Sequence, residues 1–219
     1  MSFYQQLQQS TAADRAILFS APIIGRALTG QVERSHYLNF LVRAFHHVKH
    51  TVPLLMACGA RLSDQQEWLR SAIAHYIEEE IGHHEWILSD IAAAGGDADA
   101  VRNSASDRDT ELMVAYAYDT VMRCNPVGLL GMVFVLEGTS ISLACDVATI
   151  LQRTLELPAN AFTYLNSHGA LDVEHMGHFE KLVNNLTSAA DQQCITHRAQ
   201  VFFHLYGNIF RSIDLGVPL

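Results

Sequence analysis

Apolar residues recur at helical spacing along almost the whole chain of 219 residues, and no segment alternates apolar and polar residues for long. Apolar positions three or four residues apart form one face of an α-helix, whereas a half-buried strand would alternate. Hydrophobic residues make up 49% of the chain, which is enough for such helices to share a large core. The pattern therefore predicts an all-α fold.

Glycines, prolines and capping residues divide this pattern into seven principal helices. No Gly/Ser-rich linker and no shift in composition separates them, so we expect residues 1–219 to form a single domain built as a seven-helix bundle. The expected helices span about residues 12–28, 32–58, 64–94, 109–124, 126–155, 167–186 and 189–213, with a loop over 97–107.

The overall charge and the N-terminal segment narrow the class of protein. The formal net charge is −9, which makes the chain a poor candidate for binding a phosphate backbone. Residues 1–22 lack the basic and apolar regions of a signal peptide. The longest apolar run, 127–136, is too short to span a bilayer and ends at Glu137. We therefore expect a cytoplasmic protein that binds neither nucleic acid nor a membrane.

The four cysteines are far apart and form no C-x-x-C motif. Cys58, Cys124, Cys145 and Cys194 each lie in an apolar, helix-like stretch. This distribution favours buried free thiols in a reducing compartment over disulfides or a thiolate metal site.

The most informative of the twelve histidines lie in the segment 167–178. His168, Asp172 and His175 are spaced i, i+4 and i+7, which places them within about 60° of one another around a helix. Two imidazoles and a carboxylate on one face suit iron, manganese or zinc. His178 follows one turn later and is a candidate second-sphere residue. The alternative is a solvated polar face.

A second group lies in the middle of the helix expected at 64–94. Glu80 and His83 are spaced i, i+3, and Glu79 and His83 are spaced i, i+4. A Glu-x-x-His pair inside a bundle is the unit that carboxylate-bridged di-iron proteins use. Gly82 is expected to let another backbone approach. Consecutive residues point in different directions, so we expect Glu78 and Glu85 to face water.

The third candidate is Glu137, the only charged residue between Arg123 and Asp146. A carboxylate in so apolar a helix is costly unless it is paired or bound to a metal. A hydrogen bond to a neighbouring tyrosine or histidine is the alternative. Taken together, the three groups supply six ligands for two divalent ions, namely Glu80, His83, Glu137, His168, Asp172 and His175, with Glu79 as the alternative to Glu80.

These residues resemble those of a known family. The Glu-Glu-x-Gly-His segment at 79–83, the lone Glu137 and the His-x3-Asp-x2-His segment at 168–175 are similar to the haem-oxygenase-like di-iron oxidases. That group belongs with the iron-containing redox enzymes and with the thiaminase-II and PQQ-synthesis protein C superfamily. The spacing of the first motif varies within the family, which leaves both Glu79 and Glu80 open.

The resemblance extends from the second expected helix to the last. It implies a seven-helix haem-oxygenase-like fold, two iron ions with manganese or zinc as substitutes, O2 as a co-substrate, and often a homodimer. It implies no single substrate, since members oxidise fatty acids, amino-acid side chains or their own residues. The expected activity is therefore O2-dependent oxidation or oxygenation of a small fatty-acid-like or amino-acid-like molecule.

Several other readings of the sequence remain. A thiaminase-II-like hydrolase would need a placed cysteine, for which Cys124 and Cys145 are available. A metal-free enzyme like PQQ-synthesis protein C would need basic side chains, and few lie near the motifs. A haem oxygenase needs a histidine in its first helix, but none precedes His36. A non-enzymatic metal-binding bundle is the last alternative.

Two further segments are candidates for lining a cavity. The aromatic stretch 201–210 could line a pocket, although an ordinary core role is the stronger expectation. His46 and His50 share one helical face, which borders either a cavity, the core or a dimer contact.

Overall fold

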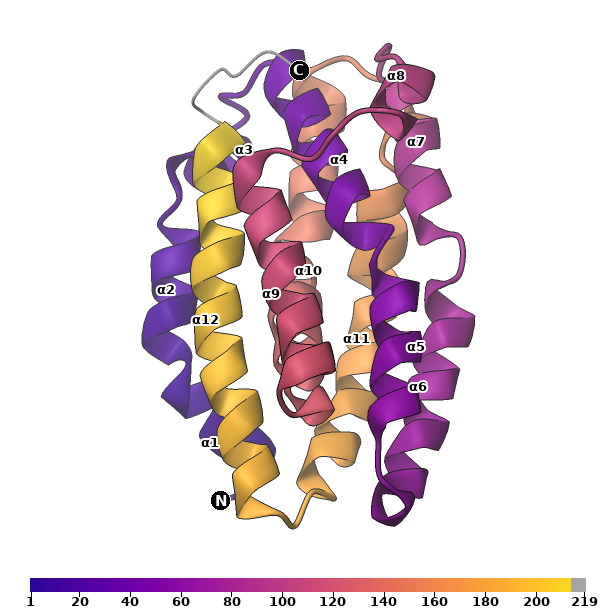
Figure 1. The fold of residues 1–219 in the computed structure, drawn as a ribbon. Coiled ribbons are helices and arrows are strands. Elements are labelled where there is room, and N and C mark those ends of the chain that lie inside the picture. Colours follow the sequence, from indigo (N-terminus) through magenta and orange to yellow (C-terminus); the bar gives the residue numbers. More distant parts are fainter. Residues whose placement is uncertain (214–219) are drawn as a thin grey trace.

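The structure is a computed structural model that describes residues 1–213, with the side chains of all of these except 168–174. Every regular element in this range is helical, so the all-α prediction is confirmed (Figure 1). The α-helices are α1 (Phe3–Ser10), α2 (Ala12–Phe19), α3 (Pro22–Leu28), α4 (Arg34–Val48), α5 (Thr51–Arg61), α6 (Glu67–Glu80), α7 (His83–Ala93), α8 (Ala98–Arg102), α9 (Arg108–Arg123), α10 (Leu129–Thr154), α11 (Thr163–Asn184) and α12 (Ala189–Ile213). Short 3-10 helices lie at η1 (Asp64–Gln66), η2 (Pro126–Gly128) and η3 (Ala159–Ala161).

Three of the seven expected helices are each divided in two, which raises the helix count within residues 1–213. Pro22 begins α3 and holds the preceding Ala21 in an extended conformation, which separates α2 from α3. Pro53 lies in the first turn of α5, where its ring would clash with the carbonyl of Lys49 in a continuous helix. The third break, between α6 and α7, occurs at Gly82, which has a φ of 90°.

Two short helices were not expected. A capping box between Ser2 and Gln5 stabilises the start of α1, at the N-terminal end of the chain. The segment 97–107, expected to be a loop, contains α8, whose first turn is capped by the Asp97 side chain accepting from the backbone N–H of Ala100 at 2.9 Å.

The long helix α10 is a core element of the bundle and packs mainly against α11 and α12. Together with η2 it spans Pro126–Thr154. Judged by length and composition alone, this helix could cross a membrane. The uninterrupted apolar run ends at Glu137, but the helix and its apolar character continue beyond that residue, as the helix expected over 126–155 implies. Most of its apolar window is buried inside the bundle, as in the core helix of many folds, so its length is weak support for a membrane span.

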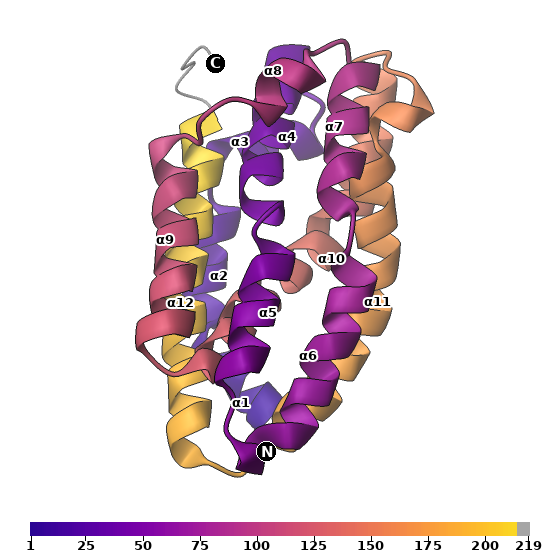
Figure 2. The same cartoon turned by 45° about the vertical axis from the view of Figure 1, so that its right-hand side comes forward.

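Figure 2 shows how the remaining helices surround this core. In that view α9 and α12 lie on one side of the bundle, whereas α6, α7 and α11 lie on the other, with α5 between them. The helices α4 and α7 pack together, as do α5 and α6. The side formed by α6, α7 and α11 carries most of the candidate ligands.

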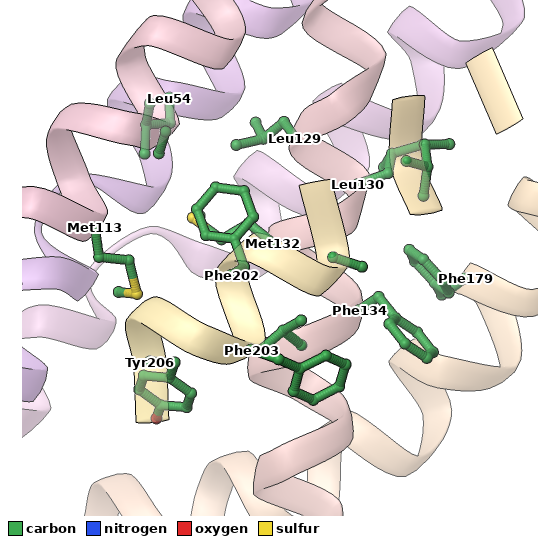
Figure 3. Packing of buried hydrophobic residues seen from close by; sticks show 14 of the residues in the cluster. Leu54, Met113, Leu129, Leu130, Met132, Phe134, Phe179, Phe202, Phe203 and Tyr206 are labelled. Carbon is green, nitrogen blue, oxygen red and sulfur yellow. The ribbon is translucent and has the colours of Figure 1, made fainter. Parts of the chain in front are cut away.

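Aromatic side chains fill the core between α10, α11 and α12 (Figure 3). The Phe134 ring lies 5.9 Å from that of Phe179 and 6.1 Å from that of Phe203. The backbones of α10 and α12 approach closely at Gly131, where a Cβ atom would lie 2.7 Å from the amide nitrogen of Ala199. This packing fixes α10 and hence the position of Glu137.

Candidate metal centre

Glu80 and His83 lie on either side of the break between α6 and α7. Glu80 is the last residue of α6, His83 is the first of α7, and their Oε2 and Nδ1 atoms are 3.2 Å apart. Both are buried, with exposed fractions of 9% and 2%. Glu80 and His83 are adjacent, as their spacing predicted, but the prediction that one continuous helix runs through them is wrong.

Gly82 makes this break possible, for a different reason from the one expected. Among the atoms that the structure describes, a Cβ atom at Gly82 would meet none within 4 Å, so no described backbone packs against it. Its φ of 90° is instead a conformation that side-chain-bearing residues rarely adopt. The break turns the chain so that Glu80 and His83 face the interior, while Glu78 and Glu85 are exposed as predicted.

His175 on α11 lies between two carboxylates from other helices. Its Nδ1 is 3.9 Å from Oε1 of Glu137 on α10, and its Nε2 is 3.4 Å from Oε2 of Glu79 on α6. His175 and Glu137 are 3% and 8% exposed, whereas Glu79 is half-buried. The sequence left open whether Glu79 or Glu80 is a metal ligand. In the structure each of them lies beside a predicted ligand histidine, Glu79 beside His175 and Glu80 beside His83.

Three predicted residues are placed less completely. His168 and Asp172 lie on the helical backbone of α11, two turns and one turn before His175, but their side chains are outside the described residues. His178 is exposed, and its ring lies 6.1 Å from that of His75 on α6. His178 therefore lies on the outer side of the bundle.

A cavity joins the two buried carboxylates. Glu80 and Glu137 both line it, together with Tyr76 and His47. Carboxylates in such a setting repel one another and lose hydration unless a cation is close. Imidazole and carboxylate donors of this kind suit iron, manganese or zinc. The residues present therefore fit a divalent metal centre.

A second, larger cavity adjoins the first. Its lining is mainly aliphatic and aromatic, from α3, α4, α10, α11 and α12. Ser140, Tyr164 and Tyr206 line both cavities and mark where they meet. The Ser140 hydroxyl is buried there, and no protein atom in the described part of the chain hydrogen-bonds to it. Together the two cavities place a polar compartment beside an apolar one.

Some cavity residues were missed by the sequence analysis. His46 and His50 line neither cavity: their ring nitrogens contact the Ser104 hydroxyl at 3.0 Å and the Tyr118 hydroxyl at 3.1 Å. Their neighbour His47 is the one that lines the polar cavity, with its ring packed edge-on against Tyr206 at 5.7 Å. Adjacent residues of a helix point about 100° apart, so the choice between these histidines depends on which face of α4 is turned toward the cavity.

The aromatic stretch 201–210 plays both of the roles considered for it. Phe202 and Phe203 are core residues, whereas Tyr206 and Phe210 line the apolar cavity. Residues 202, 206 and 210 follow one another at one-turn intervals on α12, so the division depends on position along the helix rather than on which face the residues share.

The start of α11 is fixed by a buried carboxylate. Asp90 on α7 accepts hydrogen bonds from the backbone N–H of Thr163 at 3.0 Å and of Tyr164 at 2.8 Å. Burial raises the pKa of Asp90, while these hydrogen bonds act in the opposite direction. The helix that carries His168, Asp172 and His175 is therefore held at its first turn by the helix that begins with His83.

The chain belongs to the iron-containing redox enzyme family, because the sequence profile of that family matches residues 38–207. A comparison with curated proteins found no match.

Solved structures of low sequence identity share the fold. A protein from Shewanella denitrificans, described as a domain of unknown function with a heme oxygenase-like fold, is 23% identical, with a TM-score of 0.88 over 98% of this chain and 93% of that one. A TenA homologue from Pseudomonas syringae is 12% identical, with a TM-score of 0.79 and the same coverage. Heme oxygenase-1 from the cyanobacterium Synechocystis, in complex with heme, is 14% identical, with a TM-score of 0.75 over 98% and 93% of the two chains. The fold is thus heme oxygenase-like, as the resemblance implied.

Proposed function

We propose that this protein is a non-haem, O2-dependent oxidase or oxygenase that uses two iron ions to oxidise a small organic substrate. The observation that carries the proposal is the burial of two carboxylates and two imidazoles, those of Glu80, His83, Glu137 and His175, inside the bundle. Family membership supports iron as the metal.

The ligand set nearly neutralises the charge of two divalent metal ions. Two divalent ions carry four positive charges, and Glu80, Glu137 and Asp172 return three negative ones. His83, His168 and His175 supply neutral donors. Bound iron would supply the electrons and coordination positions for O2 chemistry. The protein's own contribution is to hold these ligands on four helices, α6, α7, α10 and α11, and to keep water away from the centre.

The adjoining cavity favours the fatty-acid-like substrate class over the amino-acid-like class. An alkyl chain would gain from transfer into the apolar cavity, at roughly 25 cal/mol for each Å² of apolar surface removed from water. Its polar end would then lie where the cavities meet, and the Ser140 hydroxyl is available there to donate a hydrogen bond. Such an orientation presents the polar end of the substrate to the carboxylate-lined compartment.

The cysteines argue against a thiaminase-II-like hydrolase. None lines either cavity in the part of the chain that the structure describes. The four thiols are free as predicted, but Cys124 and Cys145 are exposed rather than buried. Cys58 is buried, and burial raises the pKa of its thiol to about 12, which keeps it protonated and unreactive at neutral pH.

The cavity linings also disfavour a metal-free enzyme that holds an anionic quinone precursor. Among the residues lining the two cavities that the structure describes, none is lysine or arginine. Haem binding is a separate alternative, since His36 on α4 lines the apolar cavity. That alternative is tested directly by adding haemin and looking for a Soret band of a histidine-ligated haem.

The central test is anaerobic loading with Fe²⁺, followed by metal counting and exposure to O2 with saturated fatty acids of graded chain length. We expect about two irons per chain, set by the ligand inventory, and consumption of O2 that depends on the fatty acid. The His175→Ala variant should lose iron, whereas His197→Ala, an exposed histidine on α12, should retain it. Absence of iron binding, or iron binding without any turnover, would overturn the proposal, the latter in favour of a non-enzymatic metal-binding bundle.

A further inference from the structure

Three polar side chains gather on the outer side of α6 and α11, away from the buried centre. They are His75 and Glu79 on α6 and His178 on α11. One ligand atom from each lies within 4.8 Å of the others. His75 and His178 are exposed and Glu79 is half-buried, so solvent reaches the cluster directly.

The donor types and their spacing match a transition-metal site. His75 and Glu79 are one helical turn apart, and His75 Nε2 lies 3.2 Å from Glu79 Oε1. His178 adds a second imidazole from a different helix, with its ring 6.1 Å from that of His75. Two imidazoles and one carboxylate bind iron, zinc or manganese and leave positions open for water. Only small rotations of exposed side chains are needed to bring the three donor atoms onto one ion.

Glu79 connects this exposed cluster to the buried centre. Its Oε1 faces His75 at the surface, whereas its Oε2 lies 3.4 Å from Nε2 of the buried His175. The helix α11 presents His178 outward and His175 inward, three residues apart. A single carboxylate therefore has one oxygen in each of two neighbouring sets of metal donors (α6 and α11 lie side by side in Figure 2).

We propose that His75, Glu79 and His178 form an exposed divalent-metal site that captures Fe²⁺ and passes it inward through the Glu79 carboxylate. Ion capture at the surface depends only on the three side chains. The inward transfer rests on the proposed function, because it requires a buried iron centre. Transfer exchanges ligands without any change of oxidation state: the ion leaves the two surface imidazoles, keeps the Glu79 carboxylate and gains His175.

The competing explanation is an ordinary surface contact. Exposed His–Glu pairs contribute little and need no metal. That explanation predicts that removing the imidazoles changes neither metal stoichiometry nor loading, which makes the two readings separable.

Capture is tested by titrating the metal-free protein with Zn²⁺ alone in a calorimeter. The variant carries His75→Asn and His178→Asn together, and the control carries His197→Asn on α12. We expect the double variant to lose one class of Zn²⁺ sites, with affinity reduced at least as much as the ~10–100-fold typical when groups that support a metal site are removed. An unchanged stoichiometry and affinity would overturn the site. Circular dichroism melting checks that the double variant folds, as expected for two exposed positions.

Transfer is tested by mixing the metal-free protein anaerobically with Fe²⁺ and quenching with an iron chelator at timed intervals. The double variant should load the buried centre about tenfold or more slowly while reaching the same final iron content in that centre, since its buried donors are unchanged. A loading rate equal to that of the His197→Asn control would overturn the transfer. If the native chain takes up Zn²⁺ at the exposed site but no iron inside, the proposed function fails and the capture site stands.

Discussion

Gly82 offers a direct test of how the backbone builds the metal centre. It joins α6 to α7 between Glu80 and His83 with a φ of 90° and a ψ of −7°. A Cβ atom there would meet no described atom within 4 Å, so the Gly82→Ala variant collides with nothing in the part of the chain that the structure describes. Any loss of stability must therefore come from the backbone conformation itself.

The size of that loss follows from the conformation. A left-handed conformation costs an L-residue about 1–2 kcal/mol, so Gly82→Ala should destabilise the protein by that amount. Asparagine tolerates this region better, and Gly82→Asn should lose less than Gly82→Ala. The matched control is Gly25→Ala within α3, where a Cβ also meets nothing and φ is not positive. Alanine favours a helix over glycine by up to about 1 kcal/mol, so the control should be neutral or stabilised.

Urea unfolding followed by circular dichroism gives the free energy of unfolding of each variant, and anaerobic Fe²⁺ titration gives its metal affinity. We expect Gly82→Ala to weaken iron binding as well, because the turn sets the 3.2 Å approach of Glu80 and His83. Equal unfolding free energies for Gly82→Ala and Gly25→Ala would refute the reasoning. So would an asparagine variant less stable than the alanine one.

Four other predictions test the elements around the site. Asp90→Ala should lower the free energy of unfolding by about 1–3 kcal/mol, measured in urea, because two buried N–H groups at the start of α11 lose their acceptors. Gly131→Ala should cost about 1–3 kcal/mol in the same assay, since its Cβ would press on the α12 backbone. Burial and the nearby Lys49 lower the pKa of His46 to about 4, so the folded state loses stability as pH falls from about 6.5 to about 4; acid titration of His46→Gln should show a shallower loss there. Without metal, Glu137→Gln should melt at or above the temperature of the native protein, and the order should reverse when metal is added, with the native protein gaining about 2.7 kcal/mol at a metal concentration 100 times Kd.

The sequence predicted the helical class because helical periodicity is local and was nearly continuous. It predicted the buried carboxylate in α10 because a lone charge in an apolar helix needs compensation. It missed the division of three helices. The division between α4 and α5 depends on Pro53, whose ring would clash with the carbonyl four residues earlier in a continuous helix. The spacing of apolar residues does not reveal this effect.

The choice between Glu79 and Glu80 is the clearest case of what helical spacing could not decide. On a continuous helix, Glu79 at i, i+4 and Glu80 at i, i+3 would both lie within reach of His83. The left-handed turn at Gly82 removes that competition, since it gives Glu80 to His83 and leaves Glu79 for His175 on another helix. A backbone angle at one residue thus reassigns the partners of two carboxylates.

The break at Gly82 also links the helices that build the site. Consecutive residues of α6 point in different directions around the helix, so Glu80 faces the interior while Glu79, one residue earlier, lies at the boundary with one oxygen directed each way. The turn after Glu80 starts α7, whose first residue, His83, lies beside the Glu80 carboxylate. Asp90 on the same helix then holds the first residues of α11 and with them the helix that bears His175. The two helices on either side of one change in backbone direction therefore position both glutamates, His83 and the start of the helix that bears His175.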